Sequence, residues 1–179
     1  MTTIIAGNPQ NPVLVLVHGF GGSGSLYYKV MKGLSENFYL IIIDLLGMGS
    51  SSRPACSFRN GGEADQLFIS AIEIWRINMG DLTNFYVAAH SYGGYIFGTY
   101  ASLYPQHIRK LVLLSPLGIK PAPEDFDVAR IRFMRGNGPP KWVVGIASAL
   151  WGKISPFSVL KLRSEAKVRE ILNGYIQRH

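Results

Sequence analysis

Short, unbroken apolar runs recur along the first two thirds of this chain. Val13 to Val17 is such a run, and its length and β-branched residues are typical of a strand buried on both faces of a sheet. Tyr39 to Ile43, Phe85 to Ala89 and Leu111 to Leu114 have the same character. These four runs predict four buried strands.

Helical patterns separate these runs. Leu26 to Glu36 and Tyr92 to Tyr104 are expected to be helical, and so is Ala64 to Met79, in which Leu67, Phe68, Ile72 and Trp75 recur at helical spacing. Strands that alternate with helices join through right-handed crossovers and form a parallel sheet with helices on both faces. The pattern therefore predicts the α/β class with a mostly parallel sheet.

The pattern changes after Leu114. Six prolines break this part of the chain into short pieces, and two helical patterns follow, at about Lys141 to Trp151 and at Ser164 to Gln177. We interpret residues 1–115 as the N-terminal part of a sheet core and residues 116–179 as a partial helical cap or lid over it.

Charge is distributed unevenly between these two parts. The chain carries a net charge of +7, and residues 116–179 hold eleven basic and five acidic residues, so nearly all of the excess lies in the cap. Basic residues interleaved with Trp and Phe are typical of a surface that binds anionic membranes. A solvated cap surface is an equally good interpretation.

The strongest chemical signal is the segment Ala89-His90-Ser91-Tyr92-Gly93-Gly94. It follows a predicted buried strand directly and opens a predicted helix, which is the context of a nucleophile elbow, a sharp turn that presents a reactive serine. The turn requires small residues two positions before and after the serine, and Ala89 and Gly93 meet this requirement. An ordinary turn with Ser91 capping the helix is the alternative, and the strand–turn–helix context disfavours it.

A glycine-rich loop, His18-Gly19-Phe20-Gly21-Gly22, follows the first predicted strand. Such a loop can bring backbone N–H groups close to a substrate oxygen, and we assign the N–H groups of Phe20 and Tyr92 as the oxyanion hole. His18, Gly19, Gly21 and Gly93 are expected to support it. The loop lacks the residues of a complete nucleotide-binding motif. We interpret a second glycine-containing segment, Asp44 to Ser51, as a structural loop because no helix follows it at once.

Together these segments resemble the α/β-hydrolase superfamily over about residues 11–115. Leu45-Leu46-Gly47, Ser51-Ser52-Arg53-Pro54, Ile72 to Arg76 and Ser115 to Gly118 resemble more narrowly the family of lipid-droplet lipase coactivators, N-acylphospholipid hydrolases and lysophosphatidic acid acyltransferases. This resemblance implies a substrate with long acyl chains, a role in phospholipid and triacylglycerol balance, and a cytoplasmic location with peripheral contact to droplets or membranes. Some members carry Asn at the elbow and are non-enzymatic coactivators, so Ser91 favours the catalytic branch.

The remaining members of a catalytic triad are not evident. In this fold the order is Ser, then Asp or Glu, then His, and both partners follow later strands. His179 ends the chain on a helical pattern, His90 is expected to point away beneath the turn, His107 lies at a helix end, and Asp125 and Asp127 lie among cap prolines. We expect the triad Asp and His, and the last strands of the fold, to lie beyond His179. The chain alone is then expected to turn over little or no substrate.

Three function classes stay open. The first is a serine-dependent lipid ester hydrolase or acyltransferase, although no His in residues 1–119 begins the His-x4-Asp motif of the acyltransferases. The second is a non-catalytic protein that binds a lipid surface or a partner. A peptidase is compatible with the chemistry but fits the resemblance poorly. The sequence predicts no cofactor, no metal site and no nucleic-acid binding, and leaves the oligomeric state open.

Overall fold

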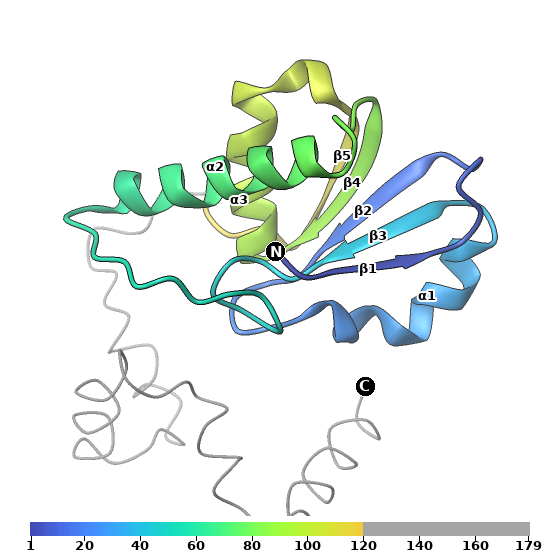
Figure 1. Cartoon of the computed structure of the whole chain (residues 1–179), viewed down its shortest axis with the longest axis horizontal. Helices are drawn as coiled ribbons and strands as arrows, with labels where there is room; N and C mark the ends of the chain where they lie inside the picture. The colour runs from blue at the N-terminus through green and yellow to red at the C-terminus, as the bar shows by residue number, and fades with distance from the viewer. Residues whose placement is uncertain (120–179) are drawn as a thin grey trace, which may run out of the picture. The chain divides into compact units, whose positions relative to one another are not determined.

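The computed structural model describes residues 1–119, which form a five-stranded sheet with helices on both faces (Figure 1). The strands lie in the order β1-β3-β2-β4-β5. Their bounds are Thr3–Ala6 for β1, Val13–Val17 for β2, Tyr39–Ile43 for β3, Phe85–His90 for β4 and Ile108–Leu114 for β5. The helices are α1 (Tyr28–Ser35), α2 (Gly61–Asn78) and α3 (Tyr92–Leu103), with short 3-10 turns η1 (Gly24–Tyr27) and η2 (Pro105–His107).

The parallel strands β3, β2, β4 and β5 confirm the predicted α/β class. β2 pairs in parallel with β3 and β4, and β4 pairs in parallel with β5. In this register Val17 lies beside Ile43 and Ala89, and His90 lies beside Leu114. The carboxyl ends of all four strands therefore meet at one edge of the sheet, where α/β folds carry their sites.

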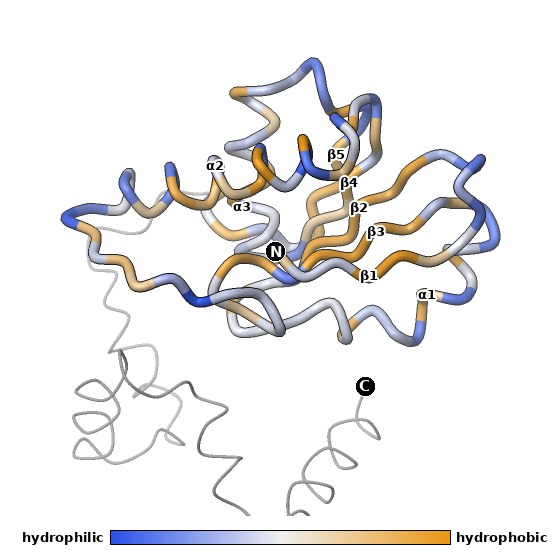
Figure 2. Tube along the Cα trace, in the orientation of Figure 1, coloured by the Kyte–Doolittle hydropathy of each residue, from blue (hydrophilic) through white to orange (hydrophobic). Residues whose placement is uncertain are grey.

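Alternating side chains of the central strands fill two apolar layers. Val15, Val17, Ile41, Ile43 and Val87 are buried on the face covered by α2 and α3. Leu14, Leu16, Leu40 and Ile42 are buried on the face covered by η1 and α1. Burial on both faces explains why the sequences of β2 and β3 are continuously apolar (Figure 2).

The chain departs from the predicted elements near its start and at β5. β1 was not predicted, and it pairs antiparallel with β3 at one edge of the sheet. The expected helix Leu26 to Glu36 instead begins as the 3-10 turn η1 and continues as α1. β5 begins at Ile108 rather than Leu111 because Ile108 and Lys110 pair with Phe85 and Tyr86 of β4, while Arg109 lies at an irregularity in this ladder.

β5 lies at the other edge of the described sheet and exposes Val112, Leu113 and Leu114. The expected cap helices, Asp125, Asp127 and His179 lie outside residues 1–119, so the proposed division at residue 115 stays a prediction. Within residues 1–119, no helix is both long enough and apolar enough to cross a membrane.

Candidate active site at the nucleophile elbow

Ser91 occupies a strained backbone conformation between β4 and α3. Its φ is +52° and its ψ is −116°, a combination that costs a non-glycine residue on the order of 1 to 3 kcal/mol and that clusters at functional sites. The Ser91 side chain does not cap α3. The structure therefore shows a sharp strand-to-helix turn at Ser91, and the helix-capping alternative is not observed.

Backbone hydrogen bonds hold this turn in place. The Ser91 N–H donates to the Leu114 carbonyl at 3.0 Å, and the Ser91 carbonyl accepts from the N–H groups of Tyr95 at 3.1 Å and Leu117 at 3.0 Å. The first and third of these bonds come from the end of β5 and the residues just after it. The turn is thus fixed from its own helix and from the neighbouring strand, which offsets its strain.

Two glycines allow the close packing around the serine. A Cβ on Gly93 would lie 2.8 Å from Val17 Cγ1 and would also collide with the His18 carbonyl oxygen. A Cβ on Gly19 would lie 3.0 Å from both Ser91 Cβ and His90 Nδ1. The start of α3 therefore packs directly on the end of β2, and the Gly19–Phe20 peptide lies beside Ser91.

His18 is fully buried and organises the loop after β2. Its Nε2 accepts a hydrogen bond from the Leu45 N–H at 3.0 Å, so the proton is on Nδ1, which donates to the Gly19 carbonyl at 2.7 Å. The Gly22 N–H also donates to the Gly19 carbonyl, at 3.1 Å. The Gly19 carbonyl oxygen therefore accepts two hydrogen bonds from within the loop.

Asp44 joins this loop to the one after β3. Its carboxylate accepts from the N–H groups of Gly24 at 2.6 Å and Ser50 at 2.7 Å, and its carbonyl accepts from the Ser51 hydroxyl at 2.6 Å. No helix follows the loop until α2 begins at Gly61. The Asp44 to Ser51 segment is therefore a structural loop, as its sequence indicates.

Of the backbone N–H groups near Ser91, the two that the sequence analysis selected have no acceptor within residues 1–119. They belong to Phe20 and Tyr92. Tyr92 is the first residue of α3, where a backbone N–H has no partner inside the helix, and the helix dipole places partial positive charge there. Tyr92 follows Ser91 directly, and Phe20 follows Gly19, whose backbone comes close to Ser91 Cβ. The oxyanion role expected of these two N–H groups stays a prediction.

Three aromatic side chains surround Tyr92, and the sequence analysis did not predict this cluster. The Tyr92 ring makes edge contacts with Phe20 and Phe68, with ring centroids 6.1 Å and 5.5 Å apart, and stacks on Tyr95 at 6.0 Å. The Tyr95 hydroxyl donates to Asp65 at 2.6 Å. Burial, followed by the Asp65 charge and the neighbouring Tyr95, raises the pKa of Tyr92 to about 12, so its phenol is neutral at physiological pH.

None of the histidines within residues 1–119 forms a hydrogen bond with the Ser91 hydroxyl. His18 bonds to Gly19 and Leu45, and His107 contacts Glu73 and Gln106 at the far end of α3. His90 is exposed and its ring lies beside Gly19, so the prediction that it points beneath the turn is wrong. A bulkier residue than Gly19 would have to displace that ring.

Metal-ligating groups and one cavity were located relative to Ser91 in residues 1–119. No group of three potential metal ligands occurs in residues 1–119. A cavity of about 370 Å³ lies between the N-terminal segment and α2, and its lining, which includes Met1, Leu46, Ile74 and Trp75, is mostly apolar. It contains none of the residues around Ser91.

Comparisons with known proteins agree with this geometry. Residues 12–149 match the family described as "alpha/beta hydrolase fold". The chain is 38% identical over 149 residues to the (lyso)-N-acylphosphatidylethanolamine lipase of Bos taurus, covering 83% of this chain and 41% of that protein. It is 33% identical over 147 residues to the human 1-acylglycerol-3-phosphate O-acyltransferase ABHD5, covering 82% of this chain and 38% of that protein.

A solved structure gives the same result. The crystal structure of a membrane phospholipase A, a bacterial virulence factor, superposes with a TM-score of 0.62 at 26% identity, covering 76% of this chain and 42% of that one. The chain spans about two fifths of the length of the curated relatives named above. Because the family match extends over most of the sequence and the sheet and elbow agree with it, this chain belongs to the α/β-hydrolase fold family.

Proposed function

We propose that this chain carries the nucleophile and the oxyanion hole of a serine-dependent lipid ester hydrolase or acyltransferase. The observation that carries the proposal is the strained Ser91 turn with the free N–H groups of Phe20 and Tyr92 beside it. A strained serine next to two unpaired backbone donors is the arrangement that acyl transfer requires.

In the proposed reaction, Ser91 Oγ attacks the carbonyl carbon of an acyl ester while a histidine base takes the hydroxyl proton. The carbonyl oxygen becomes a tetrahedral oxyanion that accepts hydrogen bonds from the Phe20 and Tyr92 N–H groups. Collapse expels the alcohol, which takes the proton from the histidine, and leaves Ser91 acylated. Water or an acceptor hydroxyl then releases the acyl group. The base and the carboxylate that orients it come from outside residues 1–119.

Lipid is the proposed substrate class for two reasons. The related lipase and acyltransferase both act, by name, on glycerophospholipid-type molecules. The Phe20 side chain beside the serine is 66% exposed, which gives the site an apolar wall at its entrance. Long-chain lysophospholipids, N-acylphospholipids and acylglycerols are therefore the substrates to test, and a cytoplasmic location with peripheral contact to membranes or droplets is proposed with them.

The test is turnover of lipids in the longest natural form of the protein. Radiolabelled lysophospholipid, N-acylphospholipid and diacylglycerol are supplied with and without an acyl-CoA and a glycerol-3-phosphate-type acceptor, so that free fatty acid reports hydrolysis and a new ester reports transfer. Ser91→Ala is expected to abolish product. Ser102→Ala is the matched control, since Ser102 is an exposed serine on the same helix whose hydroxyl bonds only to the Thr99 carbonyl.

The 179-residue chain is expected to show little turnover in the same assay, because no histidine of residues 1–119 forms a hydrogen bond with Ser91. Equal turnover by wild type and Ser91→Ala would overturn the proposal. Binding of the protein to lipid without Ser91-dependent product would instead favour the second candidate, a non-catalytic lipid-surface protein or lipase coactivator.

A further inference from the structure

One face of α2 approaches the proposed oxyanion hole although α2 carries no residue of the nucleophile motif. Asp65 and Phe68 lie three positions apart on this helix, and so occupy neighbouring positions on its surface. Both face α3, where Asp65 accepts from the Tyr95 hydroxyl and Phe68 contacts the Tyr92 ring. A helix outside the motif is therefore in contact with the residue that follows the nucleophile.

Tyr92 is held from three directions by these contacts. Phe68 meets its ring edge-on at an interplanar angle of 83°, Tyr95 stacks on it at 26°, and Phe20 meets it edge-on at 88°. Offset and edge-to-face arrangements at these separations are the favourable geometries for aromatic pairs. These contacts restrict rotation of the Tyr92 side chain, next to a turn that the Ser91 backbone hydrogen bonds already hold.

Phe20 lies in an exposed, glycine-flanked part of the loop and contacts the Tyr92 ring. Glycines flank it on both sides, Gly21 has a φ of +68°, and the Phe20 side chain is largely exposed. The His18 and Gly22 bonds hold the Gly19 carbonyl but leave the Phe20 N–H free. Among the aromatic contacts of residues 1–119, Phe20 makes one, with Tyr92. That ring contact couples the two residues that supply the proposed oxyanion donors.

We propose that Asp65 and Phe68 are positioning residues that set the oxyanion hole through Tyr95 and Tyr92. Asp65 fixes the Tyr95 ring, Tyr95 and Phe68 enclose the Tyr92 ring, and Tyr92 in turn seats Phe20, so that both backbone N–H groups stay beside Ser91. This inference rests on the proposed function, because it assigns the oxyanion role to those two N–H groups. It adds a chain of four side-chain contacts that links α2 to the catalytic turn.

The expected size of the effect follows from what an oxyanion donor contributes. Removing such a donor outright lowers kcat by about 100- to 1,000-fold, and a misplacement of about 1 Å costs up to roughly 100-fold. Loss of one aromatic contact shifts the donors but does not remove them, so its effect is smaller than that of removing a donor. We therefore expect Phe68→Ala to lower kcat about tenfold and to leave KM within about twofold, since the contact acts on the transition state rather than on substrate binding.

The experiment measures the rate constant of fluorophosphonate labelling at Ser91, and kcat and KM, in the longest natural form of the protein. The phosphonyl oxygen of the probe occupies the oxyanion hole, so the rate constant reports donor placement, whereas the final extent of labelling reports the folded fraction. Phe68→Tyr keeps the ring and is expected to restore the rate, while Phe68→Leu keeps only apolar volume and is not. Asp65→Asn, which loses the charged acceptor of Tyr95, is expected to fall between wild type and Phe68→Ala.

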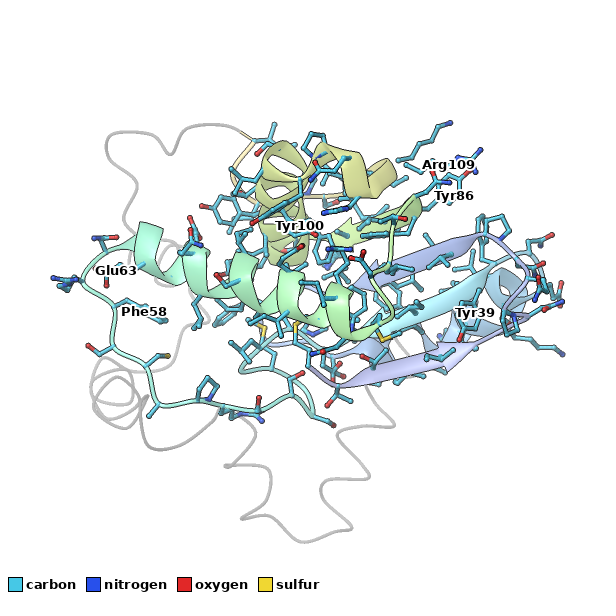
Figure 3. All side chains as sticks on the ribbon, turned by 45° about the horizontal axis from the view of Figure 1, so that its top comes forward. Tyr39, Phe58, Glu63, Tyr86, Tyr100 and Arg109 are labelled. Carbon is cyan, nitrogen blue, oxygen red and sulfur yellow. The ribbon has the colours of Figure 1, made fainter. Side chains whose placement is uncertain are left out.

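Phe58→Ala is the matched control. Phe58 is an exposed phenylalanine in the segment before α2, and it makes none of the ring contacts found within residues 1–119 (Figure 3). It should leave rate constant and extent unchanged. If Phe68→Ala lowers only the extent, or if Phe68→Leu labels as fast as Phe68→Tyr, Phe68 is merely a packing residue and the inference is overturned. If wild type shows no Ser91-dependent labelling, the proposed function itself fails and the inference with it.

Discussion

At the scale of single residues, the site depends on its glycines as much as on Ser91. Gly93 is the clearest case, because the helix that carries the elbow packs against the end of β2 with no room for a Cβ. The sequence motif requires a small residue there, and the structure gives the reason: Val17 and the His18 carbonyl occupy the space. The close approach keeps the first turn of α3 next to the loop after β2.

Gly93→Ala is expected to destabilise the fold by about 1 to 3 kcal/mol, because the added methyl overpacks a buried contact. Urea unfolding measured by circular dichroism gives the change. Gly98→Ala is the matched control on the same helix. A methyl group at Gly98 would meet no other atom within 4 Å, and this variant should be neutral or more stable by up to about 1 kcal/mol. Equal losses in both variants would contradict this account of the elbow packing.

Glu73 is a second residue with a measurable energetic role, away from the site. A hydrogen bond from Arg76, with a second from Tyr100, lowers the pKa of its carboxyl to about 2. The Tyr100 hydroxyl donates to Glu73 from α3, and Glu73 lies on α2. Figure 3 shows Tyr100 on α3. Arg76 is buried and also pairs with Asp81, so Glu73 neutralises a charge that would otherwise be costly to bury.

The stability of the fold should therefore depend on the ionisation of Glu73. Because its folded pKa lies below the ordinary value of 4.5, ionised Glu73 stabilises the fold above about pH 4.5, and this contribution is lost as the pH falls toward 2. Glu73→Gln is expected to cost about 2 to 3 kcal/mol at pH 7 and to flatten the pH dependence in that window. Thermal unfolding from pH 7 to pH 2 measures both effects. Glu36→Gln is the control, since Glu36 is exposed and accepts a hydrogen bond within residues 1–119 through its backbone carbonyl, so this variant should show neither effect.

At the scale of elements, the buried central strands were predictable and the edges were not. β2 and β3 begin and end at the residues that their apolar runs indicate. Both faces of these strands are buried, so every position is apolar and the ends of each run mark the ends of the strand. β1 is only four residues long and its side chains are half exposed, so its sequence carries no such run. Its place in the sheet depends on pairing with β3, a contact that local sequence does not record.

The candidate site divides in the same way. The Ser91 turn and the Phe20 loop are local in sequence, and their spacing relative to the strands was enough to identify them. Asp65 and Phe68 lie more than twenty residues before Ser91, and only the packing of α2 against α3 brings them to Tyr92. The sequence does contain a signal for this contact. A polar and an aromatic residue lie three positions apart on one helix, and two tyrosines lie three positions apart on the next.

Ser51 is predicted to strengthen the attachment of the residue before β1, beside the ladder that pairs β1 with β3. Its hydroxyl donates to the Asp44 carbonyl at 2.6 Å and accepts from the Thr2 N–H at 2.8 Å. Ser51→Ala leaves both backbone groups without this partner and is expected to cost about 1 to 3 kcal/mol. Hydrogen exchange at the β1 amides and urea unfolding measure the loss. Ser50→Ala is the control, since Ser50 is exposed and bonds to Asp44 through its backbone.

At the scale of the whole molecule, charge and chemistry are separated along the chain. The elbow and the oxyanion loop lie within residues 1–119, and the basic excess lies in residues 116–179. For a lipid-directed enzyme, a basic segment of this kind can attract an anionic surface. The charge distribution was readable from the sequence alone.

Binding to anionic lipid is therefore expected to be electrostatic. The chain should sediment with vesicles that contain phosphatidylserine at low salt, release them at high salt, and ignore pure phosphatidylcholine vesicles. Ser91→Ala should bind like wild type, which separates surface attachment from catalysis. Binding that is equal on neutral and anionic vesicles would contradict a role for the basic segment.

The central claim is that Ser91 is an activated nucleophile, and reaction with a fluorophosphonate tests it most directly. The 179-residue chain and the longest natural form of the protein are treated with the probe, and mass spectrometry of the peptide that contains Ser91 locates the adduct. We predict rapid labelling at Ser91 in the longer form, slow or no labelling in the 179-residue chain, and none in Ser91→Ala. A longer form that is folded, binds lipid and stays unlabelled at Ser91 would contradict the account and identify the protein as a lipid-binding member of its family.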